Sequence, residues 1–132
     1  MGKNKKGGRP IDPMSNPRTM SREGMRLIRN MANGTFNFYN EGHVFRDTDF
    51  CNAVIFEVDK RRMDASIHLV AMQYTYGAST DAHVLNLIHR DRKTLEAYNL
   101  IREILNSIVI NGGDTTFLHV LENRLPQYKY FI

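Results

Sequence analysis

The amino-acid sequence predicts a mainly α-helical fold: a compact bundle of four to five helices with a flexible basic N-terminal arm and an extended C-terminal peptide. Apolar residues recur at helical spacing in several segments, and Gly, Asn or Pro separates these segments. The chain of 132 residues suffices for one domain, and 42% hydrophobic with 24% charged residues is an ordinary globular composition. We therefore expect an arm over residues 1–19, a helical domain over 20–125 and an apolar docking peptide over 126–132.

The first helix is expected to begin with Thr19 or Ser21 as its N-cap and to end near Ala32. Met25, Ile28 and Ala32 stand at positions i, i+3 and i+7, which places them on one apolar face. The Asn-Gly pair that follows is a typical helix stop.

After an aromatic connector over 35–46, residues 48–76 fit either one helix or a β-hairpin at 53–72. Two short runs of alternating apolar and polar residues favour the hairpin. Glu57 and Arg61 form an i, i+4 pair that supports a helix, and no Gly, Asn or Pro marks the turn that a hairpin needs. Helix is therefore the preferred interpretation.

Three further helices are expected in the C-terminal half. A short one is capped within residues 79–81, and a longer one runs from about Arg92 to the break at 111–113. Asp114 or Thr115 caps the last, which a proline stops.

The single cysteine argues for a reducing compartment, the cytoplasm or a virion, because Cys51 cannot form an internal disulfide. The neighbouring Phe50 and Ala53 suggest that this thiol is packed and structural. No apolar run approaches the ~18 residues of a membrane span. We expect no membrane association.

The sequence carries no recognisable catalytic or metal-binding pattern. There is no second cysteine and no His-Glu-x-x-His motif, and the turn at 111–116 lacks the Lys-Ser/Thr of a phosphate-binding loop. We therefore predict that the protein is not an enzyme and needs no cofactor, metal or small-molecule substrate. The histidines are expected to be ordinary surface or half-buried residues: His43, His68, His83, His89 and His119.

The net charge of +4 sits entirely in residues 1–19, and the remaining 113 residues hold thirteen basic and thirteen acidic side chains. A cationic arm on a neutral body suits nucleic acid or an acidic protein surface, and a merely solubilising tail is the alternative. The first helix prolongs the basic stretch. The predicted nucleic-acid or partner-binding residues are Lys3, Lys5, Lys6, Arg9, Arg18, Arg22, Arg26 and Arg29.

The C-terminus ends in large apolar side chains, which a free solvated tail would not need. Because Pro126 stops the preceding helix, we expect these residues to run extended. They either fold back onto their own core or insert into a neighbouring subunit, and we predict the second. The predicted assembly residues are Tyr128, Tyr130, Phe131 and Ile132.

Two resemblances bear on function. Residues 5–10 are similar to the basic Gly-Arg-Pro core of an AT-hook, which implies that Arg9 could enter a narrow minor groove, although Ile11 and Asp12 stand where that family has a second basic residue. The layout of basic arm, helical body and apolar C-terminal peptide resembles the ring and head-tail connector proteins of tailed bacteriophages. That resemblance implies a structural component next to the portal channel and a homo-oligomeric ring in contact with other subunits. The alternative is a small DNA-binding protein, regulatory or similar to a terminase small subunit, that uses the arm and the first helix.

Overall fold

The computed structural model describes residues 16–132, so most of the predicted arm lies outside the described residues. Within this range the chain forms five α-helices and no strand, which confirms the mainly helical prediction. The helices are α1 (Pro17–Asn33), α2 (Phe38–Glu41), α3 (Thr48–Tyr76), α4 (Ala82–Ile110) and α5 (Leu118–Arg124). Short 3₁₀ helices occupy Gly42–Arg46, Thr115–Phe117 and Leu125–Tyr128.

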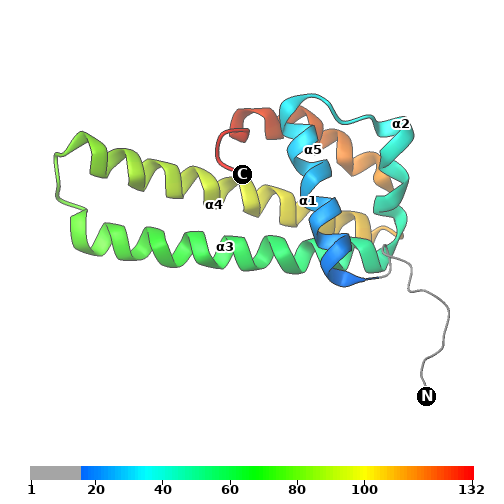
Figure 1. Ribbon diagram of the computed structural model, residues 1–132, viewed down its shortest axis with the longest axis horizontal. Coiled ribbons are helices and arrows are strands. Elements are labelled where there is room, and N and C mark those ends of the chain that lie inside the picture. The colour runs from blue at the N-terminus through cyan, green and yellow to red at the C-terminus, as the bar shows by residue number, and fades with distance from the viewer. Residues whose placement is uncertain (1–15) are drawn as a thin grey trace, which may run out of the picture.

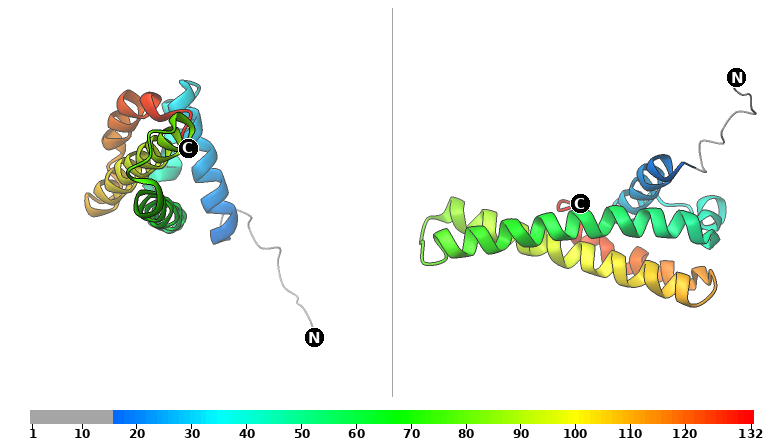
Figure 2. Two further views of the ribbon diagram at one scale, coloured as in Figure 1. Left: turned by 90° about the vertical axis from the view of Figure 1, so that its left-hand side faces the viewer. Right: turned by 90° about the horizontal axis from the view of Figure 1, so that it is seen from below.

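Two helices of 29 residues each, α3 and α4, form a long antiparallel hairpin (Figure 1). Each is about 43 Å long at 1.5 Å per residue. The other helices pack around one end of this hairpin, and the opposite end projects as a pair of helices (Figures 1 and 2). The helical interpretation of 48–76 is confirmed, and the β-hairpin at 53–72 is wrong.

The ends of α3 follow from its capping residues. The Asp47 carboxylate accepts hydrogen bonds from the backbone N–H groups of Asp49 and Phe50, at 2.9 and 3.3 Å. At the other end Gly77 donates its N–H to the carbonyl of Gln73. These contacts satisfy backbone groups that a helix end leaves without partners.

The expected short helix and the helix from Arg92 are one continuous helix, α4. Asp81 caps it by accepting from the N–H groups of His83 and Val84. The prediction of a break was wrong because the charged residues before Arg92 include no Gly or Pro, so nothing interrupts the hydrogen-bond ladder.

The N-cap of α1 lies three residues before Thr19, the first of the two predicted caps. Asn16 is the N-cap, and its side-chain oxygen accepts from the N–H of Arg18 at 2.9 Å. Pro17 occupies the first turn, where its missing N–H costs nothing. The predicted Asn-Gly stop is confirmed: Gly34 has φ 77°, a left-handed conformation that glycine adopts without strain.

The core lies where α1 crosses α3 and where α4 and α5 close the other sides. The crossing is close because Gly24 of α1 lies against the buried Val54 of α3, and a Cβ atom at Gly24 would overlap the Cγ2 methyl group of Val54. The largest fully buried side chains are Phe45, Phe50, Met25, Leu27, Ile28, Met31, Ile101, Leu105, Ile108, Leu118, Leu121 and Leu125.

The C-terminal residues fold back on α4 instead of running extended, so that expectation is wrong. Pro126 lies in the first turn of a 3₁₀ helix, where proline is tolerated. The Tyr128 hydroxyl donates to the Glu96 carboxylate at 3.3 Å, and the Thr94 hydroxyl donates to the carbonyl of Phe131 at 3.2 Å. Both partners lie on α4.

The predicted assembly residues therefore divide into two kinds. Tyr128 and Ile132 pack against the core, and the ring of Phe131 lies edge-on to that of His89. Tyr130 is 75% exposed. Docking of the tail on a neighbouring subunit stays a prediction, and Tyr130 is the side chain best placed for it.

Candidate polyanion-binding site

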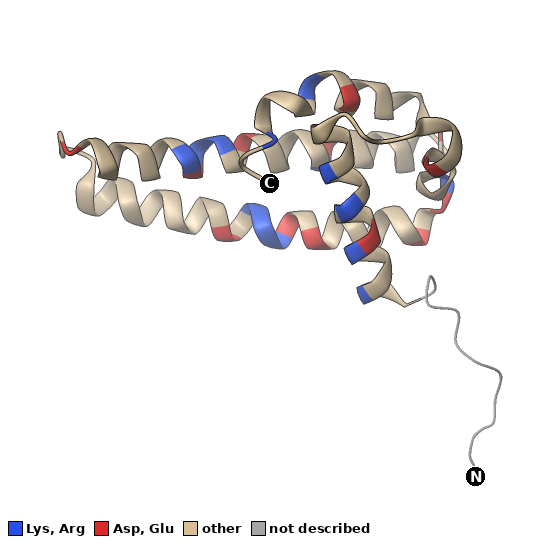
Figure 3. Ribbon diagram, turned by 45° about the horizontal axis from the view of Figure 1, so that its top comes forward, with Lys and Arg blue, Asp and Glu red and all other residues tan. Residues whose placement is uncertain are grey.

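Helix α1 places three arginines on one of its faces. Arg18, Arg22 and Arg29 are separated by four and seven residues, which corresponds to nearly whole helical turns. Figure 3 shows basic residues distributed along the length of this helix. Within residues 16–132, no carboxylate lies within the 4.0 Å of an ion pair from any of these three guanidinium groups.

A fourth arginine joins them from α3. Arg61 lines a depression of about 160 Å³ between α1 and α3, together with Arg18, Arg22 and Arg29. Its Nε donates to the Glu57 carboxylate at 2.8 Å, and its Nη1 donates to the Tyr98 hydroxyl at 3.4 Å. These two bonds hold the guanidinium in place. We call Arg18, Arg22, Arg29 and Arg61 the arginine face.

Arg61 was not among the predicted binding residues. The sequence showed only its i, i+4 pairing with Glu57, and nothing in the spacing indicates that α3 meets α1 at this position. The contact depends on the close crossing at Gly24. The four arginines of the arginine face line one depression together with the carboxylate-bearing Glu57, which is ion-paired with Arg61.

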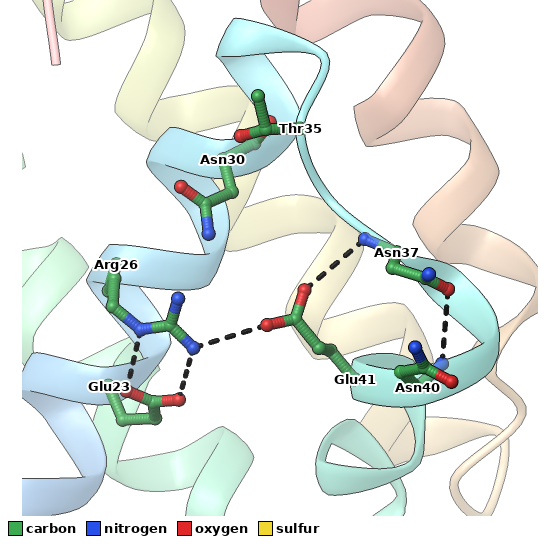
Figure 4. Close-up of polar contacts among 7 residues, drawn as sticks. All are labelled: Glu23, Arg26, Asn30, Thr35, Asn37, Asn40 and Glu41. Carbon is green, nitrogen blue, oxygen red and sulfur yellow. Dashed lines mark hydrogen bonds and ion pairs between the residues drawn. The ribbon is translucent and has the colours of Figure 1, made fainter.

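Arg26 has different surroundings from its neighbours on α1 (Figure 4). Its guanidinium donates to both carboxylate oxygens of Glu23, at 2.8 and 2.6 Å, and to Glu41 at 3.3 Å. Glu41 in turn accepts from the N–H of Asn37 at 3.2 Å. Hydrogen bonds from Arg26 hold the pKa of the Glu23 carboxyl below its usual value. Two carboxylates thus balance the charge of Arg26, and this cluster ties α1 to α2.

The remaining predicted basic residues, Lys3, Lys5, Lys6 and Arg9, lie outside the described residues. The chain that carries them enters the described part at Asn16, two residues before Arg18. At 3.3–3.6 Å per residue, fifteen residues reach at most about 50 Å from that point. They can therefore act on the same ligand as the arginine face.

Cys51 occupies the packed structural position that the sequence predicted. The side chain is fully buried, and its Sγ donates to the carbonyl oxygen of Phe45 at 3.0 Å. Burial, with the nearby Asp47 carboxylate, raises the pKa of the thiol to about 12. The neutral thiol is a poor nucleophile.

The histidines are scattered over the described part of the chain. One histidine contact could not be foreseen from the sequence. The Nδ1 atom of His68 on α3 lies 2.5 Å from the Oδ2 atom of Asp91 on α4. Among residues 16–132, no three His, Cys, Asp or Glu side chains come together in a way that could hold a metal ion. The absence of metal and of enzymatic activity stays a prediction.

In the part of the chain that the structure describes, no helix combines the length and apolar character needed to cross a membrane. Comparison of the chain with protein-family models, with curated proteins and with solved structures finds no match.

Proposed function

We propose that this protein is a non-enzymatic component of a multi-subunit particle and that it holds nucleic acid through its arginine face. The observation that carries the proposal is the grouping of Arg18, Arg22 and Arg29 without carboxylate partners in the described chain, beside Arg61 of α3. Arginine is well suited to this role because its planar guanidinium binds phosphate oxygens through two parallel hydrogen bonds.

The dimensions of the arginine face fit a nucleic-acid backbone. Arg18 and Arg29 are eleven residues apart, which is about 16 Å along a helix axis. Double-stranded DNA carries one negative charge per ~1.7 Å of its axis, so several phosphates fall within that length. The four basic residues between Lys3 and Arg9 would add contacts at the N-terminal end of α1.

The resemblance in layout to phage ring and connector proteins suggests a virion as the particle. In that setting, the arginine face would contact DNA near the portal channel, and subunit contacts would involve other surfaces such as Tyr130. A basic surface along a DNA channel needs affinity for the backbone and no preference for a base sequence.

The second candidate, a small DNA-binding protein with a regulatory or terminase-like role, would use the same arginine face. It differs in requiring direct contacts with base edges, because phosphate contacts alone carry no sequence information. Equal affinity for two duplexes of unrelated sequence would favour the particle component, and a difference of 10³-fold or more is what a specific factor would show.

The proposal is tested by removing the charges in the full-length chain. The variant Arg18→Gln/Arg22→Gln/Arg29→Gln is compared with Arg46→Gln/Arg90→Gln/Arg92→Gln, which removes the same charge from exposed positions elsewhere. Binding to a short DNA duplex is followed by fluorescence anisotropy over a series of salt concentrations. Each phosphate contact contributes ~0.9 to the slope of log K against log salt, so loss of three should reduce that slope by about 3.

The control variant should keep a slope close to that of the wild type. If the slope of log K against log salt falls by the same amount in both variants, net charge alone accounts for binding and the arginine face is not the site. If neither variant changes, the binding residues lie elsewhere in the chain, and the proposal fails.

A further inference from the structure

Helix α3 has a second apolar face that the described chain leaves largely exposed; only its Phe56 end is bordered by Pro17, Arg18 and Ser21 of α1. Its large apolar side chains are between 55% and 92% exposed. At 100° per residue they lie on the side opposite to Val54, Val58, Ala65 and Leu69, which are buried. The exposed set, which we call the α3 stripe, is Phe56, Met63, Ile67, Val70 and Tyr74.

The spacing of the α3 stripe is that of a coiled-coil seam. With Lys60 included, the positions from Phe56 to Tyr74 are separated by four, three, four, three and four residues. This alternation is the a/d pattern by which one helix packs along another. The stripe extends over eighteen residues, about 27 Å. The spacing and length of the stripe therefore suit a helical partner of similar length.

Residues 16–132 do not supply such a partner. Seen from below, α3 lies in front of α4 along the hairpin, with nothing laid over it (Figure 2, right). The fifteen residues before Asn16 contain only Met1, Ile11 and Met14 as large apolar side chains. Three such residues cannot match a seam of six positions.

We propose that the α3 stripe pairs with the α3 stripe of a second copy of this chain, in antiparallel orientation. The two-fold axis would pass near Ala65. Phe56 then faces Tyr74 of the other copy, and Met63 faces Ile67. Every position of the stripe has a partner in this register, and the pairing closes as a symmetric dimer.

Charges at and beside the stripe favour the antiparallel orientation over the parallel one. Parallel helices would bring Lys60 against its own copy and Asp59 beside Asp64 of the other chain, on both sides of the seam. In the antiparallel register Lys60 faces Val70 and can extend its ammonium group into water. One like-charge contact remains there, between the two Asp64 side chains.

The area involved predicts a weak dimer. From their exposed fractions, the five side chains of the stripe offer roughly 350–650 Å² per copy. A standard stable interface buries about 800 Å² per partner. We therefore expect association in the micromolar range of protein concentration, with a mass that rises with concentration.

The test is sedimentation velocity on the full-length chain, over concentrations on the order of 1–100 μM. Ile67→Glu places a carboxylate at the middle of the stripe, and Ile110→Glu makes the same change at another exposed isoleucine, 80% exposed, at the end of α4. Both variants should keep the circular dichroism spectrum and melting temperature of the wild type. The wild type and Ile110→Glu should dimerise alike, and Ile67→Glu should weaken association by on the order of 30-fold, because it would bury an unpaired carboxylate.

Orientation is tested by cross-linking through introduced cysteines with a short bismaleimide. Ser66→Cys lies next to the two-fold axis and should link two chains, whereas two Gln73→Cys residues would lie about 24 Å apart along the helix axis and should not. The wild type is the control, because Cys51 is buried. Efficient linking through Gln73→Cys would overturn the antiparallel arrangement.

A wild type that is monomeric over the whole range, or an Ile67→Glu variant that dimerises like Ile110→Glu, would overturn the proposal. The inference does not depend on the proposed polyanion binding, because the α3 stripe and the arginine face share no residue and meet only where Arg18 borders Phe56. DNA binding and dimerisation can therefore fail separately, and each measurement reports on one of them.

Discussion

The crossing of α1 and α3 at Gly24 allows the most direct test of the packing. In Gly24→Ala the new methyl group overlaps Cγ2 of Val54, which is fully buried and has a stiff β-branched side chain. Overpacking of this kind costs about 1–3 kcal/mol, and alanine recovers about 1 kcal/mol of helix propensity relative to glycine. The overlap is direct and Val54 cannot turn away, so we expect the free energy of unfolding to fall by about 1–2 kcal/mol.

A double-mutant cycle with Val54→Ala separates the overlap from the helix propensity. Removing the valine methyl groups makes room for the new Cβ, so Gly24→Ala should be stabilising by up to ~1 kcal/mol in that background. The coupling between the two sites should then be about 2–3 kcal/mol, measured by urea denaturation of all four proteins. If Gly24→Ala stabilises the wild type as much as it stabilises Val54→Ala, the two helices do not cross closely at Gly24.

Three further predictions concern stability and reactivity. A thiol reagent should label Cys51 no faster than the protein unfolds, because burial raises its pKa to about 12; rapid labelling of the folded protein would contradict this. Because hydrogen bonds from Arg26 lower the folded-state pKa of Glu23, the stabilisation from this pair is present above the ordinary value of 4.5 and is lost as the pH falls. The difference in unfolding free energy between the wild type and Glu23→Gln should therefore shrink in acid. In the C-terminal tail, Ile132→Ala should destabilise the domain by about 1–2 kcal/mol, whereas Tyr130→Ala should change its stability by less than ~0.5 kcal/mol; the reverse order in urea titrations would show that the tail is not seated on α4.

Helix ends were predictable where the chain carries a specific backbone signal. Gly34 ends α1 as expected, and the Ser-Thr-Asp segment before α4 supplies its cap, Asp81. The continuity of α4 was not predicted, because no such backbone signal lies within it. A weakening of the apolar pattern does not end a helix when no residue breaks its hydrogen bonds. Pattern alone could not separate one long helix from two.

The candidate site was predictable only in part, because the position of Arg61 beside the other arginines depends on how the helices pack. The spacing of Arg18, Arg22 and Arg29 along one helix follows directly from the sequence. Their proximity to Arg61 does not, because it requires the crossing at Gly24. The tail posed a similar problem: packing on α4 or on a neighbouring subunit would bury comparable area, so composition could not decide between them.

The ambiguity of α3 between helix and hairpin has a physical origin that also bears on function. Residues two apart on a helix differ by 200° and lie on nearly opposite faces. A helix that is apolar on two opposite faces therefore shows the same alternation as a strand, which is why Val54, Phe56 and Val58 resemble one. Val54 and Val58 are buried on one face, and Phe56 is 74% exposed on the other. A strand-like alternation within a segment free of turn residues thus indicates a helix with two partners. Helices α1 and α4 account for one face, and a second copy of α3 is the partner we propose for the other.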